Sequence, residues 1–326
     1  MATTAIRTGT LDIEGLLRAA GECKIDTCRL SVGSGCSRTT LVYDRNAKSA
    51  ERLHKVNSVT KSVLSLLVGI ALGRGQFPPL DTPLDRCLPD AQGDLRDIRV
   101  RHLLAMTAGM DWPEWGAWGG RPNPMCESDD WTAFILGRGM EARPGVRMRY
   151  NSGCSHLLSL ILQRHTGLSA ADYAARHLFG PLGIQQWQWH TDPQGVSIGG
   201  FGLALRGEDL FRLGELMLAR GRWRDRQVVP ASWIDAATAP RHHTYDWLGS
   251  YGYHWWTFTG GGRTPTTPRI YYAMGYGGQF LFVIPERETV VSFTSDLYRE
   301  PLRPLKIFSA HIAGIPYGSQ SRTRQQ

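Results

Sequence analysis

One segment constrains the fold more than any other, the apolar run that starts at Ser58 and ends at Gly73. Apolar residues recur along one side of it at helical spacing and further apolar residues fill the other sides, so it predicts a helix buried nearly all round. Lys61 lies inside this helix, where burying a charge is costly. The apolar residues are Val59, Val63, Leu64, Leu66, Leu67, Val68, Ile70 and Leu72.

Ser58 stands at the start of this helix, and Lys61 follows three residues later. That spacing places both side chains on one face of a helix. A serine hydroxyl is a weak nucleophile until a base takes its proton, and a buried lysine can be that base or can hold the charge of the base. The N–H of Ser58 can bind an oxyanion. The alternative is that Ser58 only caps the helix and Lys61 reaches the surface, since Ser-x-x-Lys also occurs by chance.

A second candidate segment is Tyr150-Asn151-Ser152, which precedes a predicted helix. A tyrosine on a rigid loop can act as an acid or a base if nearby cations stabilise its phenolate. The plainer interpretation of Tyr150 alone is a packed loop aromatic.

A third segment, Gly275-Tyr276-Gly277-Gly278-Gln279, stands at the entry to a predicted strand. Consecutive glycines there let a backbone approach a ligand closely, and the N–H of Gln279 could be a second oxyanion donor. Without the other two segments, a glycine-rich turn explains this one equally well.

The pattern along the chain predicts strands near both ends and helices between them. We expect an α/β (α+β) fold, with an antiparallel sheet built from N- and C-terminal strands, flanked by helices, and a mostly helical inserted region. We expect one unit over 1–326, with the sheet region at about 20–57 and 240–315, the helical region at about 58–239, and a disordered tail at 318–326. Strands are predicted within 28–43 and at 251–258, 270–274, 279–284 and 289–294, and helices at 100–106, 155–165, 169–177, 207–219, 231–238 and 302–312.

Composition limits the classes of partner. The net charge is +8, but the basic residues are scattered, so we expect a small-molecule substrate and neither nucleic acid nor a membrane as partner. The start of the sequence lacks the pattern of an export signal, so we expect a cytoplasmic protein. No ligand cluster suits a metal or an organic cofactor, and the oligomeric state stays open. The cysteines, expected as free thiols, are Cys23, Cys28, Cys36, Cys87, Cys126 and Cys154, of which Cys154 lies near the tyrosine segment.

Together the three segments resemble, in their order, the motifs of the serine β-lactamase and penicillin-binding protein superfamily, specifically its class C-like branch. That branch includes β-lactamases, D-aminopeptidases, esterases, amide hydrolases and acyltransferases. The resemblance implies Ser58 as nucleophile, with Lys61 and Tyr150 as its catalytic partners. Further similar segments are 100–109, 199–203, 216–223 and 229–233.

Two departures from the family pattern bear on the substrate. The tyrosine motif of the β-lactamases ends in Asn, whereas here Asn151 is second and Ser152 third. Tyr276 stands where the third motif has a lysine that helps hold the substrate carboxylate, a charge-assisted contact of about 1.5–3 kcal/mol. These departures and the missing export signal argue against a true β-lactamase or a D-Ala-D-Ala peptidase.

We therefore expect a serine hydrolase that forms an acyl-enzyme and cleaves an ester or amide bond, cyclic amides included, of a small molecule. The alternatives are an acyltransferase that passes the acyl group to an amine or alcohol and, less favoured, a non-catalytic binding protein. Tryptophans in 112–131 and 245–256 either line the pocket rim or pack in the core. Besides the three catalytic residues, the candidate oxyanion and substrate-binding residues are Gln279, Gly278, Gly277, Tyr276, Ser152, Asn151, Trp112 and Trp115.

Overall fold

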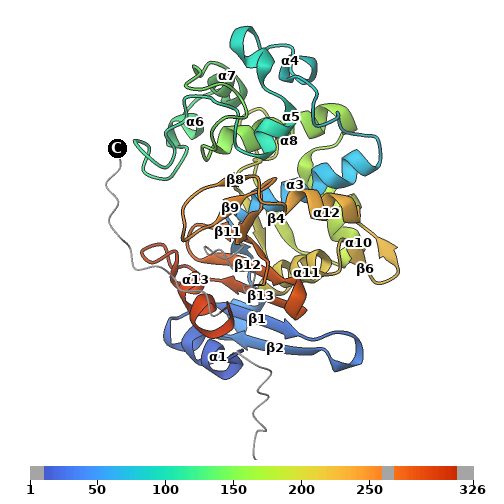
Figure 1. Ribbon diagram of the computed structural model, residues 1–326, viewed down its shortest axis with the longest axis vertical. Coiled ribbons are helices and arrows are strands. Elements are labelled where there is room, and N and C mark those ends of the chain that lie inside the picture. The colour runs from blue at the N-terminus through green and yellow to red at the C-terminus, as the bar shows by residue number, and fades with distance from the viewer. Residues whose placement is uncertain (1–10, 259–267, 314–326) are drawn as a thin grey trace, which may run out of the picture.

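An antiparallel sheet forms the base of the protein, whose computed structural model describes residues 11–258 and 268–313. Within these residues the strand order is β2-β1-β13-β12-β11-β10-β9-β8. Strands from the two ends of the chain lie side by side, because β1 pairs with β13 (Figure 1). This confirms the sheet that the sequence predicts from both termini. The strands are β1 Thr27–Val32, β2 Thr39–Asp44, β8 His242–His243, β9 Ser250–Tyr251, β10 Trp256–Phe258, β11 Ile270–Gly275, β12 Gln279–Ile284 and β13 Thr289–Thr294.

Helices cover both faces of this sheet. A Cβ added at Gly214 in α11 would lie 2.6 Å from the side chain of Leu281 in β12, so Leu281 points toward α11. The next residue, Phe282, stacks on Phe308 of α13 with ring centroids 3.8 Å apart. Since successive strand residues point to opposite faces, α11 and α13 lie on opposite sides. The helices are α11 (Gly207–Leu218), α13 (Arg303–Phe308) and α1 (Ile13–Glu22), which packs beside α13.

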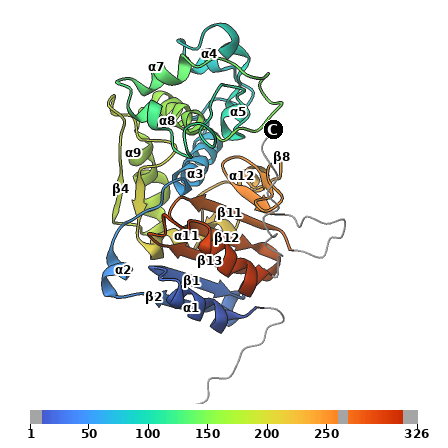
Figure 2. The same ribbon diagram turned by 90° about the vertical axis from the view of Figure 1, so that its left-hand side faces the viewer.

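Helix α3 (Val59–Gly73) lies between the sheet and the mostly helical region (Figure 2). Every residue from Val59 to Ala71 is buried, which confirms the predicted buried helix. Its buried hydroxyls are satisfied, because Ser62 and Ser65 each donate a 2.7 Å hydrogen bond to a backbone carbonyl of the segment between β9 and β10. These contacts hold the first two turns of α3, which directly follow the candidate nucleophile Ser58.

The helical region contains most of the helices that the sequence predicts. The structure also contains elements that the sequence analysis does not predict. The three-stranded sheet β3-β5-β4 and the β6-β7 hairpin are additional, as is α1. No helix in the described residues is long and apolar enough to cross a membrane. The remaining elements are α2 Ala47–Glu51, β3 His54–Lys55, α4 Leu84–Cys87, α5 Val100–Leu104, α6 Asn123–Cys126, α7 Trp131–Leu136, α8 Ser152–Thr166, α9 Ala170–Ala174, α10 Gly180–Leu182, β4 Trp187–Trp189, β5 Leu203–Leu205, β6 Arg222–Trp223, β7 Arg226–Gln227 and α12 Ala231–Ala237.

One predicted strand, 251–258, is instead two short strands, β9 and β10, joined by a turn. His254 in this turn has a φ of 61°, and its N–H donates to the carbonyl of Leu104 at 3.1 Å. The carbonyls of Tyr253 and His254 accept the hydroxyls from α3 described above. The backbone groups of this turn therefore bond to distant segments instead of to a neighbouring strand. A pattern of alternating residues cannot predict such long-range hydrogen bonds. The predicted tail at 318–326 lies outside the described residues.

Candidate active site

Ser58 is presented by a tight turn directly before α3. Asn57 has a φ of 48°, a left-handed conformation that asparagine tolerates better than most residues. Its side-chain amide donates to the carbonyl of Tyr276 at 2.6 Å, which ties this turn to the glycine-rich segment. The backbone N–H of Ser58 makes no hydrogen bond with any residue that the structure describes. It is therefore free to bind an oxyanion.

Lys61 is 1% exposed and points toward Ser58 rather than toward solvent. Its Nζ donates to Ser58 Oγ at 3.3 Å, to Ser152 Oγ at 3.0 Å and to the carbonyl oxygen of Gly200 at 2.7 Å. Burial lowers the pKa of Lys61 to about 8, against the opposing effects of Glu114 and Cys154. A substantial fraction of this lysine is neutral at mildly alkaline pH, so it can accept the proton of Ser58.

Tyr150 completes the group around Ser58. Its ring centroid lies 4.7 Å from Lys61 Nζ, and its side chain is hydrogen-bonded to Ser58. Burial, assisted by the charge of Glu114, raises the pKa of Tyr150 far above its ordinary value. The phenol therefore stays protonated in the resting site, which suits it to donate a proton and leaves Lys61 as the base.

Glu114 is a functional residue that the sequence reasoning missed. It is 2% exposed and accepts three hydrogen bonds, from Trp112 Nε1 at 2.8 Å, from the N–H of Ser152 at 2.8 Å and from Ser152 Oγ at 2.7 Å. Because Lys61 donates to the same Ser152 hydroxyl, a hydrogen-bonded chain joins lysine, serine and glutamate. In the sequence, Glu114 is marked only by being an acidic residue between Trp112 and Gly116, in a loop rich in aromatic residues and glycines.

The glycine-rich segment approaches the site through its backbone. Gly277 and Gly278 have φ values of 82° and 86°, and a Cβ on Gly278 would lie 2.3 Å from Ser295 Oγ. The side chain of Gln279 holds this turn by bonding to the carbonyls of Gly277 and Ser295. Because the side chain of Gln279 is engaged in the turn, the role of its N–H at the start of β12 as an oxyanion donor stays a prediction. Tyr276 is 43% exposed, and the Arg121 guanidinium lies 5.2 Å from its ring centroid.

The other candidate residues divide between the site and its support. Asn151 caps α8, because its Oδ1 accepts the N–H of Cys154 at 3.0 Å, and it is 3% exposed. Trp112 is fully buried behind Glu114. Trp115 is 36% exposed and stacks on Tyr150, with centroids 4.5 Å apart. Ser152 carries the contact between Lys61 and Glu114. Of the other tryptophans singled out, Trp255 and Trp256 are buried and Trp247 is exposed.

Cys154 lies close behind Lys61 and is 1% exposed. Burial raises its pKa, with a further contribution from the charge of Glu114, so it remains a thiol and does not compete as a nucleophile. The described cysteines form no disulfide, as the sequence predicts: Cys23, Cys28, Cys87, Cys126 and Cys154 are free.

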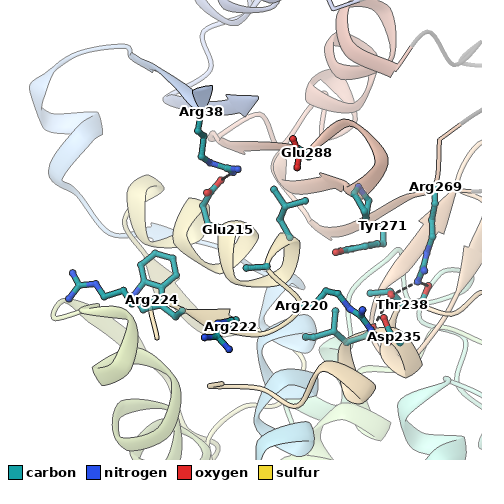
Figure 3. A pocket seen from close by; sticks show the side chains of 15 residues that line it. Arg38, Glu215, Arg220, Arg222, Arg224, Asp235, Thr238, Arg269, Tyr271 and Glu288 are labelled. Carbon is teal, nitrogen blue, oxygen red and sulfur yellow. Dashed lines mark hydrogen bonds and ion pairs between the residues drawn. The ribbon is translucent and has the colours of Figure 1, made fainter. Parts of the chain in front are cut away.

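Two cavities of similar volume are large enough for a small-molecule substrate. One, of about 710 Å³, is lined by Tyr150 and Trp115, although neither Ser58 nor Lys61 lines it. The other, of about 650 Å³, lies by the C-terminal end of α11 and is lined by none of the three catalytic candidates (Figure 3). Part of its charge is paired, Arg38 with Glu215 and Arg220 with Asp235. Among the described residues, no group of three or more His, Cys, Asp or Glu side chains could hold a metal ion.

The sequence model of the Beta-lactamase family matches residues 40–312, which is most of the chain. The chain belongs to the beta-lactamase family. This confirms the resemblance found in the sequence motifs. A 6-aminohexanoate-dimer hydrolase of Paenarthrobacter ureafaciens is 24% identical to this chain over 277 residues, which cover 76% of this chain and 67% of that protein.

Solved structures of the beta-lactamase family share the fold. A putative 6-aminohexanoate-dimer hydrolase from Bacillus anthracis superimposes with a TM-score of 0.71 at 17% identity, covering 91% of this chain and 79% of that one. A mutant of a class C β-lactamase gives a TM-score of 0.69 at 13% identity, covering 91% of this chain and 95% of the other. The predicted fold class, an antiparallel sheet flanked by helices with a helical insertion, is thus confirmed.

The contact between Glu114 and the lysine chain predicts a change in pH dependence. The charge of Glu114 raises the pKa of Lys61, so in Glu114→Gln that pKa should fall below its wild-type value of about 8. Since activity requires neutral Lys61, kcat/KM for a neutral ester should rise with pH through about 8 in the wild type and at lower pH in the variant. An inflection that stays in place or moves upward in Glu114→Gln would contradict this arrangement.

Gly200 predicts a steric effect on the same lysine. A Cβ there would lie 3.0 Å from Ser152 Cβ and 3.3 Å from Lys61 Nζ, so Gly200→Ala should displace the lysine from Ser58. We expect kcat to fall by about 10- to 100-fold, because small displacements of reacting groups carry large penalties. Gly139→Ala is the matched control, since nothing lies within 4 Å of its added Cβ. Equal kcat in both variants would show that the position of Lys61 does not depend on Gly200.

Proposed function

We propose that this protein is a hydrolase that forms an acyl-enzyme on Ser58 and cleaves an amide or ester bond of a small molecule. One observation carries the proposal: the Nζ of buried Lys61 lies 3.3 Å from Ser58 Oγ, while burial brings its pKa to about 8. A serine beside a lysine that is partly neutral near physiological pH is an activated nucleophile. The intact site also argues against a non-catalytic binding protein.

Acylation begins when neutral Lys61 takes the proton of Ser58 and the oxygen attacks the substrate carbonyl. The oxyanion of the tetrahedral intermediate is bound by the N–H groups of Ser58 and Gln279. Tyr150, which is protonated in the resting site, donates its proton to the leaving group. The proton held by Lys61 then passes to Tyr150 and restores the phenol. Glu114 holds the hydroxyl of Ser152 so that Ser152 accepts a hydrogen bond from Lys61 throughout.

Deacylation reverses these roles for water. Neutral Lys61 accepts the proton of a water molecule that attacks the acyl carbonyl, Tyr150 donates its proton to the oxygen of Ser58 as the acyl bond breaks, and the proton held by Lys61 then restores Tyr150. Hydrolysis as the outcome is supported by the relative from Paenarthrobacter ureafaciens, which is named a hydrolase. Tyr276 in place of a lysine, with a half-exposed ring at the edge of the site, favours substrates other than β-lactams.

A substrate panel tests this function. It contains p-nitrophenyl esters, p-nitroanilides, a D-amino-acid amide, a D-Ala-D-Ala peptide and a chromogenic cephalosporin, each with and without an amine or alcohol acceptor. We expect acyl groups of esters or amides to be released to water, with no dependence on the acceptor. Product that forms only with an acceptor would instead identify an acyltransferase. Rapid cephalosporin hydrolysis would contradict the argument from Tyr276.

A further inference from the structure

The cavity next to Tyr150 has an unusual distribution of charge. Its volume is about 710 Å³, and it is lined by Arg147, Arg149, Arg241, His242 and His243 but by no aspartate or glutamate. Three separate segments supply its walls, around residues 112–116, 146–150 and 241–245. Any ligand that reaches Tyr150 through this cavity therefore meets positive charge from two sides.

Two of these arginines have no carboxylate partner among the described residues. Arg149 is paired with Glu141, at 2.6 Å. Arg147 makes no hydrogen bond or ion pair with any described residue, and it is exposed. Arg241 lies 3.9 Å from the centroid of the Tyr253 ring and donates to the carbonyl of Ala236 at 3.1 Å. The cavity thus holds cationic groups that remain able to bind an anion.

The aromatic residues of the same cavity form a stack. Trp115 lies over Tyr150 at 4.5 Å with 18° between the ring planes, and Tyr245 lies 6.2 Å from Trp115 at 27°. Trp115 and Tyr245 are 36% and 49% exposed, so part of each ring is available to a ligand. Exposed, nearly parallel rings beside arginines suit a flat ligand that carries negative charge.

The position of Tyr150 indicates which part of a substrate enters this cavity. Under the function proposed above, on which this inference rests, Tyr150 protonates the leaving group. We propose that this cavity is the leaving-group subsite and that it binds a flat leaving group bearing a carboxylate, held by Arg147 and Arg241 and stacked against Trp115 and Tyr245. The carboxylate of the substrate would then bind in this cavity. It would not bind beside Tyr276, which occupies the position where the family has a carboxylate-binding lysine.

Two esters with the same acyl group test this subsite. 3-Acetoxybenzoate and 3-acetoxybenzamide both transfer acetyl to Ser58, and their leaving groups differ in charge but hardly in shape. After correction by the ratio of their alkaline hydrolysis rates, kcat/KM should favour the benzoate by about tenfold. This preference should decrease as KCl is raised from about 0.02 to about 0.5 M, because salt screens exposed charges.

Substitutions then locate the charge. The double variant Arg147→Gln/Arg241→Gln should lower the corrected preference about tenfold, with turnover of the benzamide retained. Arg147→Gln alone should lower the corrected preference for the benzoate by a smaller factor. This single variant keeps the test valid if the double variant is unstable. Arg143→Gln is the matched control, since Arg143 is exposed in the same loop but does not line the cavity. Thermal midpoints report the fold of each variant.

The outcomes separate this inference from the proposed function. An unchanged preference in both Arg147→Gln and the double variant overturns the inference while the hydrolase assignment stands. The same holds if Arg121→Gln, next to Tyr276, abolishes the preference instead. If neither ester is turned over faster than by Ser58→Ala, the function fails. Calorimetric binding of 3-hydroxybenzoate, expected to weaken about tenfold in the double variant, then still decides the inference.

Discussion

Replacing Ser58 with alanine is expected to lower kcat by about four to six orders of magnitude on any ester or amide that the wild type turns over. Neither of the two nearest candidates can replace the hydroxyl of Ser58, because Cys154 is buried with a raised pKa and Ser152 is bonded to Glu114. Substrate binding should change little, since the proposed oxyanion donors are backbone N–H groups. Initial rates measured under single-turnover and steady-state conditions give both kcat and the affinity for the substrate.

The fold of Ser58→Ala should be preserved. Ser58 makes no side-chain capping bond to α3, so its loss removes only the hydrogen bond from Lys61 and none to the helix backbone. A thermal midpoint close to that of the wild type, with activity lost, therefore isolates the chemical role. If Ser58→Ala retained wild-type kcat, a different nucleophile would have to be sought and the account would be wrong.

The second large effect is expected at Lys61. Lys61→Met keeps most of the side-chain volume but removes the base, and we expect kcat to fall by about 10²- to 10⁴-fold. Lys61→Arg keeps a positive charge that does not dissociate in proteins, so it should be similarly inactive if Lys61 acts as the base. Rates at several pH values on an activated ester compare the two variants.

The pair of Lys61 variants distinguishes a base from a fixed charge. Activity in Lys61→Arg but not in Lys61→Met would mean that the site needs only a cation near Ser58. Neither variant is expected to unfold the protein, because Glu114 retains its hydrogen bonds from Trp112 and Ser152. Thermal denaturation verifies this before the rates are interpreted.

Local patterns in the sequence predict the central part of the site. The spacing of Ser58 and Lys61 is a property of one helix, and the apolar residues around Lys61 already indicate its burial. The alternating pattern of the C-terminal strands likewise predicts the sheet. Such features depend on neighbours within a few residues, which sequence reasoning evaluates well.

The parts that sequence reasoning missed depend on distant contacts. Glu114 acquires its role only because Ser152, 38 positions later, brings its N–H and hydroxyl to the same carboxylate. The carbonyl of Gly200 reaches Lys61 across 139 positions. Asn151 was expected among the oxyanion and substrate-binding residues, a prediction that stays untested, and its Oδ1 has the additional role of capping α8. In each case the residue type permits several roles, and the fold selects one.

The most direct test of the central claim is mass spectrometry of the enzyme quenched during turnover of an activated ester, followed by peptide mapping. The account predicts that the intact mass increases by one acyl group, that the acyl group maps to Ser58, and that Ser58→Ala shows no increase. Slowed deacylation in Lys61→Met should leave any adduct on the same residue. An acyl group on another residue, or turnover by the wild type with no adduct at any time, would contradict an acyl-enzyme on Ser58.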